Sequence, residues 1–296
     1  FGREVGLENH YTILDAGESE SLLGDIVRGI DKDFLKNKGN PKVKVLSNVI
    51  SYARNTQGSI EDTLALKYPE FTSLADQVAE YARSYAKKKL ELQVADYDDL
   101  LELWLKLMQI SQETTAWFKN RFQHILVDEY QDTNALQSAI IDCVGANHQI
   151  MAVGDDAQCI CTWRGANFGN IMSFSERHPG AKLHKIVLNY RSTPEILNLA
   201  NGVLEGRPEN AGYQKDLRPV RSGLSRPVMV PAMSTDQQAQ FICRKVVELH
   251  RQDGHDLRDI AILYRAHYQS MELQMELSRG HVPFQITSGV RFFEQA

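Results

Sequence analysis

The sequence contains no long hydrophobic run: its apolar stretches are a few residues long, whereas about 20 are needed to span a bilayer. We therefore expect no membrane contact. There is also no excess of positive charge, since 33 Lys and Arg residues against 38 Asp and Glu residues give a net charge of −5. Any contact with nucleic acid must then come from local basic patches or from stacking. Only four cysteines occur, which excludes a disulfide scaffold and favours the reducing cytoplasm.

The chain also lacks an initiator methionine, a signal peptide and a transit peptide, because it begins Phe1-Gly2-Arg3-Glu4. Such a beginning is typical of a segment taken from a longer protein. With 296 residues, 43% hydrophobic and 24% charged, the chain is ordinary globular material near the upper limit of one hydrophobic core. We therefore expect about two domains.

The first part of the chain has the periodicity of α-helices. A short β-type run at residues 11–15 is followed by apolar residues spaced three and four apart, which places them on one face of a helix. This spacing predicts helices at residues 19–30, 43–53, 74–92 and 96–108.

From about residue 117 the pattern changes to short β-branched runs that alternate with helices, which is typical of a parallel α/β sheet. The predicted strands are residues 125–127, 149–153 and 183–188, with helices at 133–144 and 167–177. Residues 202–227 contain several glycines and prolines and are a predicted linker. After it, we predict strands at 228–230 and 260–263 and helices at 235–251 and 268–279.

Two acids, Asp128 and Glu129, directly follow the first predicted strand of this sheet. They would lie at the carboxyl edge of a parallel sheet, where α/β proteins bind ligands. An aspartate there can hold Mg²⁺, and a neighbouring glutamate can deprotonate an attacking water. The alternative is a plain turn whose acids complement the dipole of the next helix.

Polar side chains also follow the next two predicted strands. Gln158 follows the second, and Tyr190 and Arg191 follow the third. Since the carboxyl ends of parallel strands share one edge, we expect a convergent site on one sheet. An arginine suits a phosphoryl group there, because its planar guanidinium donates two parallel hydrogen bonds.

Three segments, DEYQDTN, VGDDAQ…TWRGA and LNYRSTPEIL, resemble motifs II, III and IV of the UvrD/Rep (superfamily 1) DNA helicases, in that order and at similar spacing. Residues 96–101 are similar to the helix before motif II, and residues 262–265 with 289–294 to the opening of the second motor domain. The resemblance covers essentially the whole chain. It implies an α/β fold with an incomplete RecA-like parallel sheet, a large helical insertion and the start of a second RecA-like domain.

The domains implied by this resemblance divide the chain into four parts. Residues 1–15 would form the edge of the first RecA-like domain, 16–116 the helical insertion, 117–213 the motor domain with motifs II to IV, and 214–296 the start of the second domain. The implied activity is that of an ATP-dependent 3′→5′ DNA helicase or translocase, of the kind used in DNA repair and replication. Its cofactors would be ATP and Mg²⁺, and its partners single-stranded DNA and junctions of single- and double-stranded DNA.

The resemblance also implies roles for individual residues in ATP hydrolysis. Asp128 would coordinate Mg²⁺ with the ATP phosphates, and Glu129 would activate the hydrolytic water. Gln158 would sense the γ-phosphate, and Arg191 would contact it as an arginine finger, a role worth about 10³–10⁵ in rate. Tyr190 would pack on the adenine. The alternatives are a surface ion pair for Arg191 and gap filling between strand and helix for Tyr190.

For DNA, the resemblance implies that Trp163 stacks on a base, worth about 1–3 kcal/mol, and that Arg164 contacts the strand. The alternative for Trp163 is a half-buried core residue. Two further groups of lysines are either solvated surface or contacts to phosphates: Lys32, Lys36, Lys38, Lys42 and Lys44, and the run Lys87, Lys88 and Lys89.

The sequence departs from the family pattern at Ala157, Cys159 and Cys161, where an acid, a serine and an aromatic residue are usual. Loss of the aromatic removes one stacking surface. The two cysteines are not expected to bind zinc, which takes four ligands, because no second pair or histidine lies at ligand spacing.

No Gly-Lys pair occurs in the sequence, so the phosphate-binding loop Gly-x-x-x-x-Gly-Lys-[Ser/Thr] is not among these residues. We therefore expect an internal fragment with little or no ATPase activity of its own. Exposed strand edges would favour self-association of such a fragment. Two other interpretations stay open: a non-catalytic DNA-binding or regulatory relic of the fold, and the helicase part of a helicase–nuclease.

Overall fold

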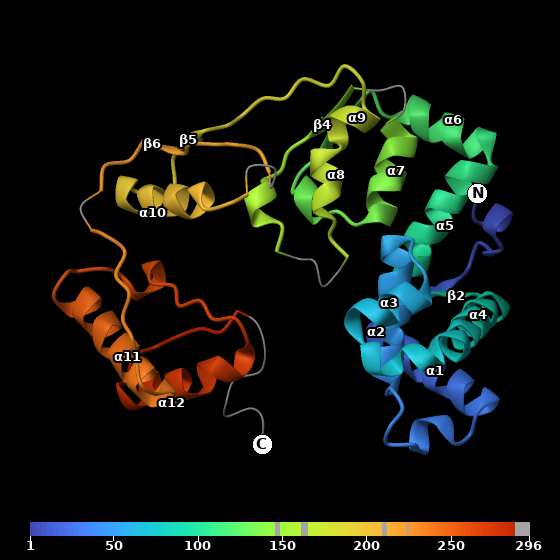
Figure 1. The fold of residues 1–296 in the computed structure, drawn as a ribbon, viewed down its shortest axis with the longest axis horizontal. Helices are drawn as coiled ribbons and strands as arrows, with labels where there is room; N and C mark the ends of the chain where they lie inside the picture. The colour runs from blue at the N-terminus through green and yellow to red at the C-terminus, as the bar shows by residue number, and fades with distance from the viewer. Residues whose placement is uncertain (146–148, 161–164, 209–211, 224, 288–296) are drawn as a thin grey trace. The chain divides into compact units, whose positions relative to one another are not determined.

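The computed structural model describes residues 1–145, 149–160, 165–208, 212–223 and 225–287. Its contacts divide the chain into two compact units, Phe1–Ser222 and Gly223–Ala296. Figure 1 shows the chain coloured from blue at the N-terminus to red at the C-terminus. The functional residues predicted from the sequence all belong to the first unit.

The described strands form three separate parallel pairs, β1 with β2, β3 with β4, and β5 with β6. Their bounds are β1 Thr12–Ile13, β2 Val94–Ala95, β3 His124–Val127, β4 Gln149–Ala152, β5 Leu188–Asn189 and β6 Arg218–Pro219.

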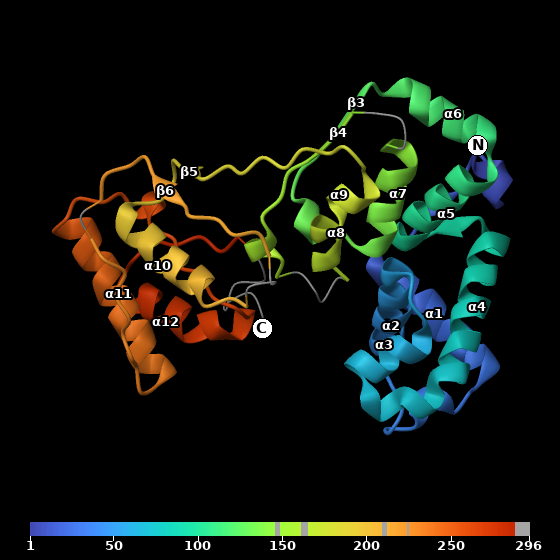
Figure 2. The ribbon, with the colours of Figure 1, turned by 45° about the horizontal axis from the view of Figure 1, so that its top comes forward.

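The pair β3–β4 is the longest, and its register runs from His124 opposite Gln149 to Val127 opposite Ala152. Figure 2 shows these two strands side by side, and helix α7 (Ala135–Gly145) joins them as a crossover. The parallel α/β class is confirmed. The prediction that residues 183–188 add a third strand to the same sheet is wrong, because only β5 forms there and it pairs with β6.

The first unit begins with a helical segment, coloured from blue through teal to the green of α6 in Figure 1. Its helices are α1 Ala16–Ile30, α2 Val43–Thr56, α3 Ile60–Lys67, α4 Ala75–Leu92, α5 Tyr97–Ile110 and α6 Gln112–Arg121. Capping boxes set two of the helix starts: Asp15 with Glu18 at α1, and Asp96 with Asp99 at α5. Helix α1 therefore begins earlier than its apolar periodicity predicts.

The core of the helical segment is built from one apolar face of each of its main helices. Leu23 and Val27 of α1, Leu46 and Val49 of α2, and Val78 of α4 are all almost completely buried. The spacing of these residues is the three-to-four pattern that the sequence shows, so the prediction of helices in this segment is confirmed.

An ionic cluster lies beside this core and joins α2, α4 and the start of α5. Its members are Arg54, Lys89, Asp96, Asp99 and Glu102. Arg54 donates from Nε to Glu102 at 2.6 Å and from Nη2 to Asp99 at 2.5 Å. Burial raises the pKa of Asp96, but the charges of Arg54 and Lys89 outweigh it and hold this pKa at about 2.

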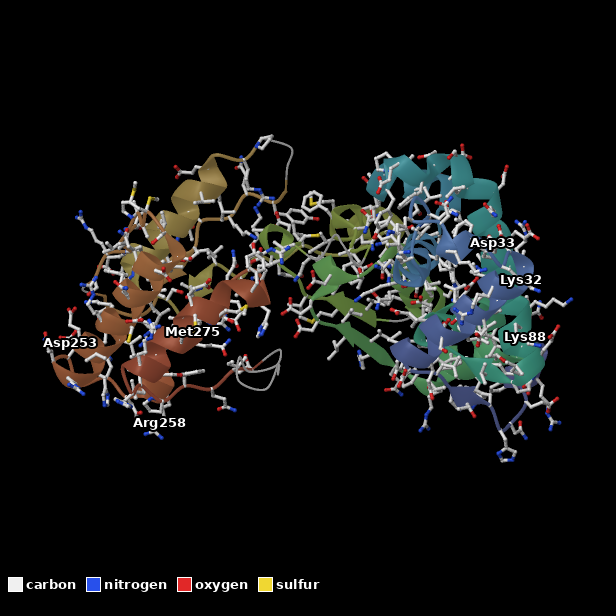
Figure 3. The ribbon with its side chains drawn as sticks, turned by 90° about the horizontal axis from the view of Figure 1, so that it is seen from below. Lys32, Asp33, Lys88, Asp253, Arg258 and Met275 are labelled. Atoms are coloured by element: carbon white, nitrogen blue, oxygen red, sulfur yellow. The ribbon has the colours of Figure 1, made fainter. Side chains whose placement is uncertain are left out.

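Lys89 is 2% exposed and is paired with both Asp96 and Asp99. The run Lys87 to Lys89 was predicted to be either solvated surface or a phosphate contact. Both interpretations are wrong for Lys89, because its side chain is buried and already paired. The exposed lysines do fit a surface position. Figure 3 shows Lys32 and Lys88 on the outside of the helical segment, where Lys88 pairs with Glu91 at 3.1 Å.

Hydrogen bonds also connect the helical segment to the loop after β3. Asn55, at the end of α2, donates to Asp98 at 2.8 Å and accepts from the Nδ2 of Asn134 at 2.7 Å. Asn134 belongs to the DEYQDTN segment, immediately before α7. This contact fixes the beginning of α7, and with it the end of the loop after β3, relative to the helical segment.

Two predictions for the middle of the chain are corrected by the structure. The helix predicted at 167–177 is two short helices, α8 (Phe168–Met172) and α9 (Phe174–Arg177), separated at Ser173, whose hydroxyl donates back to Gly169 at 2.7 Å. Residues 202–227 are more than a linker, because they contain the end of α10 (Pro194–Glu205), strand β6 and side chains that bind the loop after β4.

The second unit contains α11 (Thr235–Arg251) and α12 (Met271–Arg279), which pack together around Ala239, Cys243 and Leu273. Helix α11 has the predicted bounds, and the helix predicted at 268–279 is a 3-10 turn, His267–Ser270, followed directly by α12. The strands predicted at 228–230 and 260–263 do not form among the described residues of this unit. A strand needs a neighbour for its backbone hydrogen bonds, and Met229 and Leu263 instead remain more than nine-tenths exposed.

Within the described residues, no helix combines the length and the hydropathy that crossing a membrane requires.

Candidate nucleotide site

The two predicted acids lie exposed at the carboxyl end of β3. Beyond Val127, the ladder with β4 continues through the Val153 N–H to the Val127 carbonyl, at 2.8 Å, and the Tyr130 N–H to the Val153 carbonyl, at 2.9 Å. The chain between these two bonds bulges away from the ladder and carries Asp128 and Glu129 into solvent. Glu129 takes a left-handed conformation, φ 50° and ψ 40°, which is uncommon for a residue other than glycine.

Tyr130 anchors this bulge to the interior of the first unit. Its side chain is fully buried, packs edge-on against the ring of Phe174, and shares a hydrogen bond with the hydroxyl of Ser138 at 3.2 Å. Arg177 donates from Nη2 to the Tyr130 hydroxyl at 2.8 Å and forms an ion pair with Asp142. A buried aromatic residue held from three sides keeps the two acids at a fixed place on the sheet edge.

Gln158 follows β4 on the same edge, at the end of the 3-10 turn Asp156–Gln158. Its Nε2 donates to Asp155 Oδ2 at 2.8 Å, and the carboxylate of Asp155 also pairs with Lys215. Partial burial raises the pKa of Asp155, but the hydrogen bonds from Lys215 and Gln158 outweigh burial and leave this pKa below its usual value. Asp155 therefore stays a carboxylate that orients Gln158.

The carboxylate of Asp156 does not bind Gln158 but holds the segment after α10. It is 6% exposed and accepts from Arg207 at 2.8 Å, from Lys215 at 2.8 Å and from the backbone N–H of Tyr213 at 3.2 Å. Gly212 permits this approach, because it has φ 131° and a Cβ on it would lie 2.1 Å from Asp156 Oδ2.

Tyr190 and Arg191 lie at the carboxyl end of β5, in the separate pair β5–β6. Tyr190 is 68% exposed, and the backbone N–H of Arg191 donates to Asn189 Oδ1 at 3.0 Å. Among the described residues, no hydrogen bond or ion pair joins either of them to Asp128, Glu129 or Gln158. Their nucleotide roles stay predictions.

Trp163 and Arg164 lie outside the described residues. Gly165, which follows them, is described and takes φ 83°; a Cβ on it would lie 3.0 Å from the Thr56 methyl at the end of α2. Gly165 itself therefore lies against the end of α2.

The oxygen donors at this edge fit Mg²⁺ as it is bound with nucleotides, through one or two carboxylates and phosphate oxygens. Asp128 is exposed, and its Oδ1 is oriented by the backbone N–H of Glu129 at 2.9 Å. No group of three or more His, Cys, Asp or Glu residues is arranged to hold a metal by itself in the described part of the chain. For a metal bound at Asp128, phosphate and water oxygens would supply the remaining ligands.

This chain belongs to the UvrD/REP helicase family. The family of UvrD/REP helicase N-terminal domains matches residues 1–179, and the family of UvrD-like helicase C-terminal domains matches residues 184–296. Among individual proteins, the chain is similar to the ATP-dependent DNA helicase PcrA of Staphylococcus epidermidis, with 29% identity over 292 residues. The PcrA of Staphylococcus aureus is also 29% identical, over 293 residues. In both comparisons 98% of this chain is covered but only 39% of the relative.

Sequence reasoning did not identify the residues that support the site. Tyr130 and Gln131 stand inside the DEYQDTN segment, where they are buried directly beside the exposed acids Asp128 and Glu129. Lys215 and Arg207 lie 50 to 60 residues beyond the acids that they bind, in a stretch predicted to be a linker. No periodicity or spacing in the sequence indicates those contacts.

Proposed function

We propose that this chain is part of an ATP-dependent DNA helicase or translocase that moves 3′→5′ along single-stranded DNA. Its DNA partners would be single strands and junctions of single- and double-stranded DNA, and its setting the cytoplasm. The observation that carries the proposal is the pair β3–β4, which presents Asp128 and Glu129 after one strand and Gln158 after the next. The similarity to proteins named ATP-dependent DNA helicases supports the same activity.

In this proposal the exposed polar residues divide the work of ATP hydrolysis. Asp128 holds Mg²⁺, which when bound offsets the negative charge of the phosphates. Glu129 accepts a proton from the attacking water. Gln158 senses the γ-phosphate from the turn that Asp155 fixes. Arg191 contacts the γ-phosphate as an arginine finger.

The remaining proposed contacts belong to the adenine and to DNA. Tyr190, whose ring is largely exposed, packs on the adenine. Trp163 stacks on a DNA base and Arg164 contacts the strand. The 296-residue chain by itself is proposed to turn over little or no ATP, because no Gly-Lys pair is present to hold the β- and γ-phosphates.

Phosphate release by the protein at the length its gene encodes tests the proposal. Turnover is expected to require Mg²⁺ and to be stimulated by single-stranded DNA, and duplexes with a 3′ tail are expected to be unwound in preference to those with a 5′ tail. Turnover that is absent, or indifferent to DNA, would contradict a DNA-driven motor. Preference for a 5′ tail would contradict the direction alone.

We further propose that the 296-residue chain associates with itself through the β3–β4 pair. Leu126 and Met151 stand opposite each other in the register and are 75% and 55% exposed, although parallel sheets are usually covered on both faces. Light scattering is expected to give a mass above the 33.5 kDa of one chain, and Leu126→Lys is expected to lower it. A monomer at every concentration would refute this association.

A further inference from the structure

Gln131 is a polar residue that is almost completely buried, with 1% of it exposed. The hydrolysis proposed above gives it no role. Its carboxamide forms a hydrogen bond on each side. Nε2 donates to Glu129 Oε2 at 2.6 Å, and Oε1 accepts from the backbone N–H of Asp155 at 2.9 Å. One buried side chain therefore connects the loop after β3 to the loop after β4.

The surroundings fix both the place and the orientation of this carboxamide. A backbone N–H can only donate, so the oxygen of Gln131 must face Asp155 and its NH₂ group must face Glu129. The space is tight, because a Cβ on Gly154 would lie 2.7 Å from Gln131 Oε1. The thiol of Cys159 also donates to the backbone carbonyl of Gln131, at 3.3 Å.

Glu129, in contrast, is exposed and has a left-handed backbone conformation. Among the described residues, Gln131 is the one side chain that hydrogen-bonds to its carboxylate. The direction in which that carboxylate points therefore depends on Gln131. Because the donated bond occupies Oε2, the other oxygen, Oε1, is left to receive a proton.

On its other side, Gln131 binds a residue that also orients Gln158. The backbone N–H of Asp155 donates to Gln131, while the carboxylate of Asp155 accepts from Gln158 Nε2 at 2.8 Å. The connection therefore runs from Glu129 through Gln131 and Asp155 to Gln158, and each residue in it is joined to the next by a hydrogen bond.

We propose that Gln131 is a positioning residue that directs Glu129 Oε1 toward the attacking water and ties this orientation to the loop that carries Gln158. This rests on the proposed function, in which Glu129 is the base and Gln158 the γ-phosphate sensor. A shift of the loop after β4 changes the place of the Asp155 N–H, and the shared carboxamide transmits the change to Glu129. Hydrolysis then proceeds only when the sensor loop is in place.

Two substitutions separate the two hydrogen bonds. Gln131→Leu removes both, whereas Gln131→Glu keeps an acceptor for the Asp155 N–H and replaces only the donor to Glu129. In the 296-residue chain, hydrogen exchange of the Asp155 amide is expected to be about tenfold faster in Gln131→Leu and nearly unchanged in Gln131→Glu. Unchanged exchange in Gln131→Leu would overturn the connection.

The effect on hydrolysis is measured with the protein at the length its gene encodes, in the presence of single-stranded DNA. Both variants are expected to lower kcat about 10²-fold with KM for ATP unchanged, because a misplaced base costs roughly that much. Gln123→Leu, an exposed glutamine just before the start of β3, serves as the control and is expected to keep the wild-type kcat.

The split between kcat and KM separates positioning from a general loss of structure, because a disrupted site would lose affinity for ATP as well. A wild-type kcat in both variants, or a rise in KM for ATP as large as the fall in kcat, would overturn the role of Gln131 alone. Absence of turnover in the wild type would overturn the proposed function and this role with it.

Discussion

Replacement of Glu129 by glutamine is expected to lower the kcat of DNA-stimulated ATP hydrolysis by about 10²–10⁴-fold, the usual contribution of a general base. The amide cannot accept a proton from water at neutral pH. It nevertheless has nearly the size of the carboxylate, and its oxygen can still accept the hydrogen bond from Gln131 Nε2, which is 2.6 Å long in the structure. The substitution therefore removes the base and leaves the loop after β3 in place.

Steady-state phosphate release measures this effect in the protein at the length its gene encodes. KM for ATP and the affinity for single-stranded DNA are expected to stay near their wild-type values, since Glu129 is not assigned to binding either one. Glu113→Gln, an exposed glutamate in the first turn of α6, is the matched control and is expected to have no effect. If Glu129→Gln keeps more than about a tenth of the wild-type kcat, Glu129 is not the general base.

The second large effect is expected on stability, from Lys89→Met. Lys89 is 2% exposed and faces Asp96 and Asp99, so its loss leaves these two carboxylates with Arg54 as their remaining cation in the ionic cluster. Removal of one partner from a buried ion pair costs about 3–5 kcal/mol in the free energy of unfolding. Urea denaturation of the 296-residue chain, followed by circular dichroism, measures this loss in the transition of the first unit.

Lys88→Met is the matched control, because Lys88 is the neighbouring residue on the same helix and pairs with Glu91 on the surface, with 46% of its side chain exposed. Its effect is expected to be within about 1 kcal/mol. The double variant Lys89→Met with Asp96→Asn is expected to lose less than the sum of the two single variants, since the two residues are direct partners. Equal losses in Lys88→Met and Lys89→Met would contradict the importance of the ionic cluster.

The same cluster predicts how stability changes in acid. The pKa of Asp96 is about 2 in the folded chain and about 3.8 without its partners, so the folded state is the one that favours the carboxylate. The stabilisation from Asp96 is therefore complete above about pH 4 and is lost as pH falls toward about 2. Lys89→Met weakens the attraction that lowers this pKa, so stability measured over this pH range is expected to fall less steeply in the variant.

Local signals in the sequence predicted the bounds of several long helices, because these signals act within a few residues. The apolar periodicity gives α11 its observed bounds, Thr235–Arg251, and gives the end of α4 at Leu92. Where prediction and structure differ at a helix start, a cap decides it: Asp15 and Glu18 bond reciprocally, and α1 therefore begins at Ala16.

The strands were harder to predict, because a strand depends on a neighbouring strand that is often distant in the sequence. Residues 125–127 and 149–153 did pair, as β3 and β4. Residues 228–230 and 260–263 have the same β-branched and apolar character, but no strand lies beside them among the described residues, and they form no ladder. Composition alone does not distinguish these two outcomes.

The sequence by itself determined the family and the candidate site residues, because Asp128, Glu129 and Gln158 stand in contiguous segments whose order and spacing carry the resemblance. Tertiary structure alone decided which side chains support them. Gln131 meets Asp155 across 24 residues and Lys215 meets Asp155 across 60, while Lys89 is buried beside exposed Lys88. The physical reason is that charge and hydrogen-bonding capacity belong to each residue type, whereas burial and partners depend on which distant segments the folded chain brings into contact.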